Sequence, residues 1–200
     1  MGEAMSIDDV REALADSGKR NKWIGVWVGV LAALLAVCAV GGDNATKDAN
    51  KANIDATNTW AFFQAKNIRR TSFTLAADEL ELTLQAHPAM PAEARAAIEA
   101  KVKNYRDTVK RYARDPESKE GLDDLFQRAK EIEAERDLAL RKDPYFDFAQ
   151  ALLQIAIVLA SVAIIAGTDL LVILSFVAGG LGTLLMLNGF ALLISLPGLG

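Results

Sequence analysis

Three long apolar runs stand out in the pattern of hydrophobic and polar positions along the chain. The first, Trp23 to Val40, carries no charge, and residues 148–200 contain a single charged side chain, Asp169. A helix needs roughly 20 apolar residues to cross the hydrocarbon core of a bilayer. We therefore predict transmembrane helices at 23–41, 144–167 and 170–196.

Short polar signals mark the limits of the second and third spans. Asp143-Pro144 predicts a helix start, because the aspartate can accept bonds from free amides and proline loses nothing at the first helical position. Gly167-Thr168-Asp169 predicts a turn between the two spans. Pro197-Gly198 predicts the end of the third span and leaves 197–200 as a tail.

Residues 43–143, between the first two spans, have the composition of a water-soluble segment. From Asp43 to Asp147 the chain carries 18 Lys or Arg and 20 Asp or Glu. No proline or glycine interrupts Asn44 to Ala86, and small residues recur there at spacings of four and three, which is typical of a close-packed helix seam. The members of this seam are Ala45, Ala49, Ala52, Ala56, Thr59 and Phe63.

Beyond Trp60 the same helix is apolar on several sides. Its larger apolar residues are Phe62, Ile68, Phe73, Leu75, Leu80, Leu82 and Leu84. A helix of this kind is normally covered by more than one neighbour. The pattern is compatible both with a helix that continues the first transmembrane helix and with one that is hinged at Gly41-Gly42.

Two further helices are expected to return along this one. The string HPAMP, residues 87–91, predicts a turn, and an apolar stripe at helical spacing follows it. Asp115-Pro116 repeats the helix-start signal ahead of a second stripe that ends near Lys142. Short breaks favour antiparallel neighbours. The predicted fold class is an all-α membrane protein, in which a coiled-coil-like helical hairpin or bundle is inserted between the first and second of three transmembrane helices.

Small and aromatic side chains give the candidate contact residues. Small residues let membrane helices approach closely. We assign helix packing in the membrane to Gly25, Gly29, Ala156, Ala160 and Gly182. We assign self-association or partner binding in the middle segment to Ala49, Ala52, Ala56, Trp60 and Phe63. Core packing within the chain is the alternative role of the aromatic residues.

Charge excludes one class of partner and bears on orientation. The formal net charge is −4, whereas a nucleic-acid partner would require a basic excess. The basic residues within 19–22 favour a cytoplasmic N-terminal segment, 1–22, and an extracytoplasmic middle segment, although Arg141 and Lys142 favour the opposite orientation. We interpret the first span as a retained anchor, with a cleaved signal peptide as the alternative.

The string NTWAFFQAKNIRRTSFTLAADELEL, residues 58–82, resembles a family of bacterial membrane proteins, the domain of unknown function 4337. The first span, which begins with NKW, and the paired C-terminal spans fit the same resemblance. The resemblance implies a multi-pass protein of the bacterial inner (cytoplasmic) membrane. It implies no activity, cofactor or catalytic residue.

The chain shows no arrangement of residues that is typical of catalysis. A nucleophilic Ser or Cys normally needs a base, yet the only histidine, His87, is expected in a turn and the only cysteine, Cys38, in the first span. The alternating charges around Glu131, Glu133 and Glu135 are typical of a solvated helix face. We expect no enzyme activity, no cofactor and no metal site.

The resulting hypothesis is a non-catalytic membrane scaffold or assembly protein, surrounded by membrane lipid and present as a homo-oligomer or as a subunit of a larger complex. Its preferred form is an oligomer in which the alanine seam and Phe63 lie in a shared bundle. The alternative is a small channel or transport-accessory subunit, whose second and third helices line a path with Gln154 and Asn188.

Overall fold

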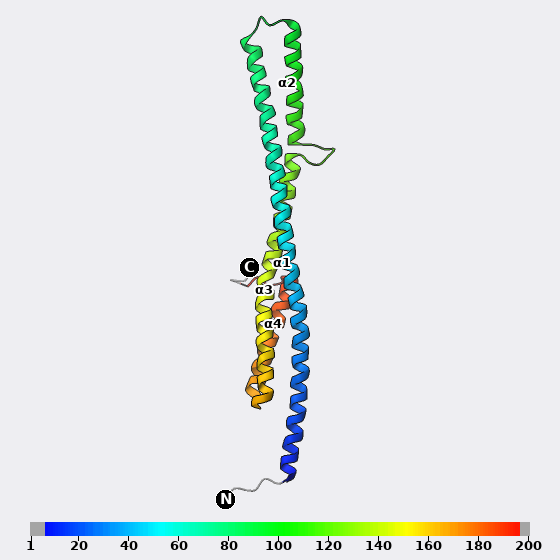
Figure 1. Cartoon of the computed structure of the whole chain (residues 1–200), viewed down its shortest axis with the longest axis vertical. Coiled ribbons are helices and arrows are strands. Elements are labelled where there is room, and N and C mark those ends of the chain that lie inside the picture. The colour runs from blue at the N-terminus through cyan, green and yellow to red at the C-terminus, as the bar shows by residue number, and fades with distance from the viewer. Residues whose placement is uncertain (1–6, 197–200) are drawn as a thin grey trace. The chain divides into compact units, whose positions relative to one another are not determined.

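The computed structural model describes the backbone of residues 7–196 and the side chains of residues 18–196. This part of the chain contains helices and no strand, which confirms the all-α fold class. The helices are α1 (Ile7–Ala86), α2 (Ala92–Ala113), α3 (Leu122–Ala166) and α4 (Asp169–Ala191), as Figure 1 shows. Residues 1–6 of the predicted N-terminal segment and the predicted tail 197–200 lie outside the described residues.

Three helical stretches are long and apolar enough to cross a membrane, which confirms the number of predicted spans. These stretches are Gly18–Ala86, Leu122–Ala166 and Asp169–Ala191. Helix α1 continues through Gly41-Gly42, so the glycine pair is not a hinge. The chain divides into two compact units: residues 1–48 with 138–200, which we call the span unit, and residues 49–137, which we call the insert unit.

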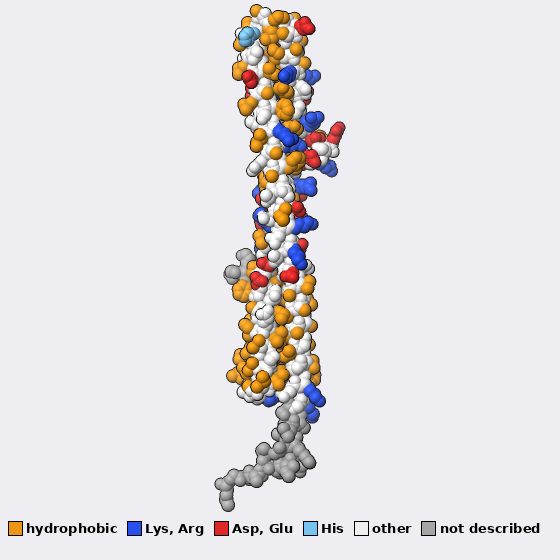
Figure 2. Space-filling model, in the orientation of Figure 1, with side chains coloured by type: hydrophobic (Ala, Val, Ile, Leu, Met, Phe, Trp, Pro, Cys, Tyr) orange, Lys and Arg blue, Asp and Glu red, His pale blue; other side chains and the backbone are white. Residues whose placement is uncertain are grey.

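The span unit is built from parts of α1, α3 and α4 around an apolar core. The core includes Leu31 and Cys38 from α1, Phe146 and Leu153 from α3, and Met186 from α4. Between its two ends, the visible surface of this unit is largely hydrophobic (Figure 2). In lipid, where the surroundings are as apolar as the core, close van der Waals packing is a main source of helix association.

Contacts along the span unit establish the directions of its helices. At one end, the Arg20 guanidinium lies 3.4 Å from the Asp169 carboxylate and donates to the Gly167 carbonyl oxygen over 3.3 Å. Further along, Trp27 Nε1 donates to Ser175 Oγ over 3.0 Å. The part of α1 around Arg20 therefore lies beside the start of α4 and the end of α3. Helices α1 and α4 run in the same direction, and α3 runs antiparallel to both.

The third span ends earlier than the sequence predicted. Helix α4 stops at Ala191 instead of residue 196, because Leu192 takes a left-handed conformation with φ 46°. The Asn188 side chain donates to the Ile194 carbonyl oxygen over 2.7 Å and accepts from the Ile194 amide over 3.0 Å. The Tyr145 hydroxyl of α3 donates to the same carbonyl over 3.1 Å. These bonds satisfy the groups that a continuing helix would have paired.

The helix start predicted at Asp143-Pro144 is wrong. Helix α3 passes through Pro144 without a break. The Asp143 carboxylate accepts a hydrogen bond from the Thr46 hydroxyl of α1 over 2.9 Å, so it does not cap a new helix. Tyr145 and Phe146, which follow the proline, are each 1% exposed. This burial favours the continuous helix despite the amide that proline lacks.

The helix start predicted at Asp115-Pro116 is also wrong, because α3 begins at Leu122. The Asp115 carboxylate instead closes a turn by accepting the backbone amides of Glu117 and Ser118 over 3.2 and 3.3 Å. Gly121 approaches this turn closely, since a Cβ added to it would lie 2.9 Å from Arg114 Cα. Only glycine fits there without a shift of the backbone.

The insert unit consists of α2 and the adjoining parts of α1 and α3. The ring of Phe73 on α1 packs against Tyr105 and Tyr112 of α2, with centroid distances of 5.3 and 5.9 Å. The turn predicted at HPAMP is confirmed, since α1 ends at Ala86 and α2 begins at Ala92. Helices α1 and α2 are therefore joined as an antiparallel hairpin.

Candidate interaction site

An aromatic cluster joins α1 to α3 in the insert unit. The Trp60 ring packs edge-on against Phe63 and Phe126, with ring centroids 5.5 Å apart in both pairs. Trp60 Nε1 donates to Glu133 Oε1 over 2.9 Å, and Lys130 Nζ lies 5.6 Å from the centroid of the Trp60 ring. Trp60 therefore packs between helices of its own chain, which was the alternative role predicted for it.

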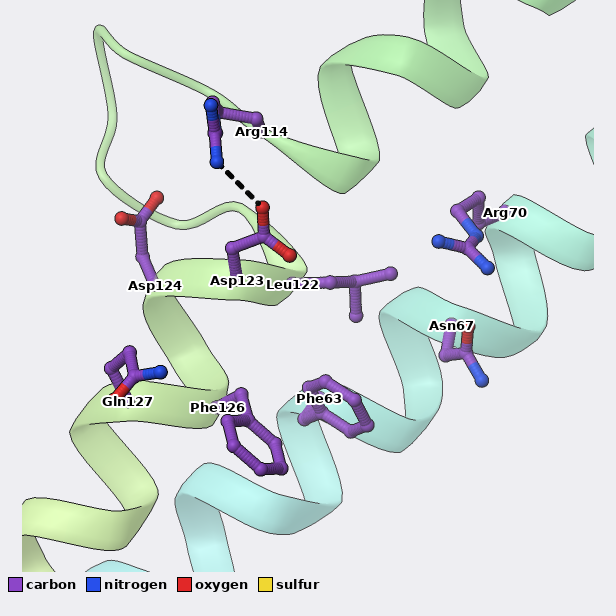
Figure 3. A pocket seen from close by; sticks show the side chains of 9 residues that line it. All are labelled: Phe63, Asn67, Arg70, Arg114, Leu122, Asp123, Asp124, Phe126 and Gln127. Carbon is purple, nitrogen blue, oxygen red and sulfur yellow. Dashed lines mark hydrogen bonds and ion pairs between the residues drawn. The ribbon is translucent and has the colours of Figure 1, made fainter.

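A groove with a volume of about 690 Å³ opens beside this cluster (Figure 3). The rings of Phe63 and Phe126, with centroids 6.3 Å apart, form its apolar side. Arg70 and Arg114 bring positive charge, and Arg114 is paired with Asp123 at 3.3 Å. The lining residues are Phe63, Asn67, Arg70, Arg114, Leu122, Asp123, Asp124, Phe126 and Gln127. The charges of the two arginines are balanced by those of Asp123 and Asp124 in this lining.

Two carboxylates of the insert unit have lowered pKa values. A hydrogen bond from Lys130, and after it the bond from Trp60, lowers the pKa of Glu133 below its ordinary value of 4.5. The backbone amide of Ser118 is the main cause of the lowered pKa of Asp115. Both groups are hydrogen-bonded in the charged form, which favours that form.

Acid is expected to weaken the insert unit. Because the folded-state pKa of Glu133 is lowered, its contribution to stability is complete above the ordinary value of 4.5 and is lost as the pH falls through the folded value. Glu133→Gln keeps an acceptor for the Trp60 N–H but does not titrate, so its stability should vary less with pH. Thermal unfolding of both proteins, followed by circular dichroism from neutral to acid pH, measures the difference. Identical pH profiles would contradict the role given to Glu133.

The predicted alanine seam is covered within the chain. Ala49, Ala52 and Ala56 are 6%, 8% and 3% exposed, and Ala129 on α3 is fully buried. A side chain that its own chain already covers offers no surface to a second chain. The burial therefore corrects the assignment of these three alanines to a bundle shared between chains. Phe63 remains accessible at the groove.

A different line of residues on α1 is left uncovered, and we call it the outer stripe. Its members, each seven residues from the next, are Ile54, Ala61, Ile68, Leu75 and Leu82. The four large side chains are 59%, 67%, 62% and 63% exposed in chain order. Figure 2 shows hydrophobic side chains among charged ones on the outside of this part of the chain. These exposed aliphatic side chains form a row along one side of α1, with polar or small residues between them.

Three of the five residues predicted to pack in the membrane contact neighbouring helices of the span unit. Ala156 and Ala160 are fully buried. A Cβ added to Gly182 would lie 3.1 Å from the carbonyl oxygen of Ala149, which requires a small residue there. Gly25 and Gly29 are different, since an added Cβ would meet nothing within 4 Å. For these two glycines, helix packing in the membrane stays a prediction.

The other polar and reactive candidates are scattered. Cys38 is buried with its Sγ 3.5 Å from the Phe146 carbonyl oxygen, and His87 is exposed beside the end of α1. The Asn188 side chain is hydrogen-bonded to the Ile194 carbonyl oxygen just beyond the end of α4. Gln154 is exposed on α3. Within the described part of the chain, no group of three or more His, Cys, Asp or Glu side chains is placed to hold a metal ion.

Comparison with protein families identifies the group to which this fold belongs. The family model described as "Domain of unknown function (DUF4337)" matches residues 20–192. The chain belongs to the DUF4337 family. The match confirms the resemblance seen in residues 58–82 and takes in both the span unit and the insert unit of this DUF4337 protein. No curated protein and no solved structure matches the chain.

Two polar contacts of this DUF4337 protein were missed by reasoning from sequence. One is the bond between Trp60 and Glu133. The other is the pairing of Arg106 on α2 with Asp78 at 2.5 Å and Glu81 at 2.8 Å on α1, and these hydrogen bonds raise the pKa of Arg106. Opposite charge at matching positions along α1 and α2, once they are aligned antiparallel, could have indicated the Arg106 pairs; no charge signal marks the bond of the neutral Trp60 to Glu133.

Proposed function

We propose that this protein is a non-catalytic integral membrane scaffold or assembly protein, whose insert unit lies outside the membrane and binds other protein chains. The outer stripe is the observation that carries the proposal. Fully burying a side chain such as Leu or Ile contributes about 1.5–3 kcal/mol. Four such side chains exposed along one charged helical unit favour a protein partner that covers them.

The proposed location is the bacterial inner membrane, with the N-terminal segment in the cytoplasm and the insert unit on the extracytoplasmic side. The basic residues within 19–22 support this orientation, because positive charge near a span favours the cytoplasm. The contact between Arg20 and Asp169 also supports it, since it brings the turn between the last two spans to the same end of the span unit as this basic cluster.

The groove gives the proposal a second binding surface. A partner segment with an aliphatic or aromatic side chain would find the rings of Phe63 and Phe126 there. A neighbouring carboxylate on that segment would find the guanidinium of Arg70, which extends from α1 toward Leu122 in Figure 3. Arginine forms strong, directional pairs with carboxylates. An apolar side chain with one carboxylate placed to reach Arg70 is therefore what a partner segment needs to fit the groove.

Two glutamates on the outer stripe are expected to abolish association. Crosslinking in cells should give reproducible products with the unaltered protein and none with Ile68→Glu combined with Leu75→Glu. The reason is that a charged side chain is strongly disfavoured in an apolar interface. Analysis of the crosslinked products by mass spectrometry and of the purified protein by light scattering provides the measurement.

Helix α2 offers a matched control for this experiment. Ala97 and Asn104 are also exposed and also seven residues apart, so glutamates at both positions add the same charge at the same spacing. This control is expected to keep the crosslinked products. Association that survives glutamates on the stripe, or a purified protein that is monomeric with no crosslinked product in cells, would contradict the proposed function.

A further inference from the structure

A second groove, which we call the span groove, lies between α1 and α4 in the span unit. It has a volume of about 370 Å³ and, apart from Arg20, is lined by hydrophobic side chains. The rings of Trp27 on α1 and Phe176 on α4, stacked with a centroid distance of 4.4 Å, join the two helices there. A groove with this lining, on a unit whose surface is itself largely hydrophobic, suits a hydrocarbon chain better than a polar ligand.

The length of the span groove matches one leaflet of a membrane. From Arg20 to Val30, which both line it, α1 rises about 15 Å at 1.5 Å per residue. The hydrocarbon core of a bilayer is about 30 Å thick, so one leaflet accounts for about 15 Å. Trp23 is 76% exposed beside Arg20, and tryptophan favours the depth of the lipid headgroups. With the span unit in a membrane, the groove therefore extends from the headgroups into the acyl chains of one leaflet.

Positive charge gathers at the headgroup end of the span groove. Lys19 and Lys22 are exposed beside Arg20. Lys19 is four residues before Trp23, and Lys22 is four residues before Val26. Residues four apart on a helix share a face, so both lysines lie one turn away from side chains that line the groove. Figure 2 shows Lys and Arg side chains at this end of the span unit.

The carboxylate of Asp169 does not neutralise this cluster. It is the only acidic residue within 18–42 and 148–196, so it balances at most one of the three positive charges. Its contact with Arg20 spans 3.4 Å, longer than a usual hydrogen bond, and its side chain is 79% exposed. Exposed pairs of this kind contribute little. The Arg20 Nε–H is also buried without an acceptor among the described residues, so the guanidinium is only partly satisfied.

We propose that the span groove binds one anionic phospholipid, with an acyl chain between α1 and α4 and the phosphate against Arg20 and the two flanking lysines. A phosphate accepts strong bonds from a guanidinium, and basic pockets between membrane helices hold anionic headgroups in this way. A zwitterionic lipid offers the same chain but brings a positive group to the basic cluster. The headgroup charge is therefore what the site selects. The inference rests on the membrane location in the proposed function, but not on the protein partner.

Quenching of tryptophan fluorescence by brominated lipid tests the inference in the full-length protein. Trp23 and Trp27 line the groove, whereas Trp60 belongs to the insert unit and is expected to give a constant background. The protein is reconstituted in mixed vesicles of phosphatidylglycerol and phosphatidylcholine, with bromine on the acyl chains of one lipid or the other. Phosphatidylglycerol is expected to be preferred about fivefold or more at low salt, since one basic residue near the membrane surface contributes about that factor.

Two charge variants locate the preference. Lys19→Gln combined with Lys22→Gln leaves the contact of Arg20 in place and is expected to bring the two lipids close to equal quenching. Arg141→Gln combined with Lys142→Gln removes the same charge from the other end of the span unit, next to the contact between Asp143 and Thr46, and is expected to keep the preference.

Two valine variants test the place of the acyl chain. Val26 lines the groove, and Val158 on α3 does not, yet both are 59% exposed. Val26→Phe puts a ring into the groove and is expected to reduce the preference for phosphatidylglycerol by at least half. Val158→Phe adds the same ring elsewhere on the span unit and is expected to match the native protein.

Each other outcome overturns the inference. Equal quenching of the native protein by both lipids would remove the selective site and leave the proposed function standing. A preference that both charge variants lose alike would reflect general attraction of the membrane surface, and one that survives Lys19→Gln with Lys22→Gln would not come from this cluster. A preference unchanged by Val26→Phe would exclude the groove. Absence of quenching by either lipid would overturn the membrane location as well, and with it the proposed function.

Discussion

Gly179→Leu is expected to destabilise the span unit by about 3 kcal/mol, near the upper end of what overpacking a tight contact usually costs. A Cβ at this position would lie 2.7 Å from Leu31 Cδ2 and 2.9 Å from Trp27 Cζ2. The Trp27 ring cannot move aside freely, because it is bonded to Ser175 and stacked on Phe176 with a centroid distance of 4.4 Å. A leucine must therefore push α4 away from α1.

The next residue supplies the control. Gly180 has nothing within 4 Å of an added Cβ, so Gly180→Leu adds an aliphatic side chain to an open surface of the same helix. Both variants gain the same helix propensity, and the difference between them reports the contact with α1 alone. Unfolding of the purified protein by sodium dodecyl sulfate in mixed micelles, followed by circular dichroism, measures it. Equal midpoints for the two variants would contradict the close packing of α1 and α4.

The three spans were predictable because their signal is local. An apolar run must be long enough to cross the bilayer, whatever it packs against, and the HPAMP turn is set by its own prolines. The helix starts at Asp115 and Asp143 were not predictable in this way. An Asp-Pro pair can begin a helix, but Asp143 is taken by the Thr46 hydroxyl of a distant segment and Asp115 by its own turn. A tertiary contact decided the case of Asp143, and a local turn decided that of Asp115.

The candidate contact residues were likewise predictable only in part. The spacing of Ala49, Ala52 and Ala56 predicted a packed face, and these residues are buried. Spacing cannot tell whether the covering helix belongs to the same chain, and here it does. Ile68, Leu75 and Leu82 were part of an apolar set that required several neighbours. Only the structure separates these exposed residues from Phe73, which α2 covers.

Trp60→Ala is expected to destabilise the contact between α1 and α3 in the insert unit by about 2–3 kcal/mol, somewhat less than a fully buried aromatic residue would lose. The substitution removes both edge-on ring contacts and leaves Glu133 without the Trp60 N–H. Because Phe63 and Phe126 also line the groove, loss of the ring between them should loosen this binding surface. Hydrogen exchange of the full-length protein should show reduced protection in residues 56–66 and 122–133.

Two further variants separate the causes. Trp60→Phe keeps an aromatic ring but cannot donate to Glu133, so its loss of protection should fall between those of the native protein and Trp60→Ala. Phe62→Ala is the positional control: this ring is 42% exposed and lies outside the cluster, so its effect should stay below about 1 kcal/mol. If Phe62→Ala loosened both segments as much as Trp60→Ala, the aromatic cluster would not be what joins α1 to α3. If only Trp60→Ala does so, the cluster both holds the two helices together and shapes the groove beside them.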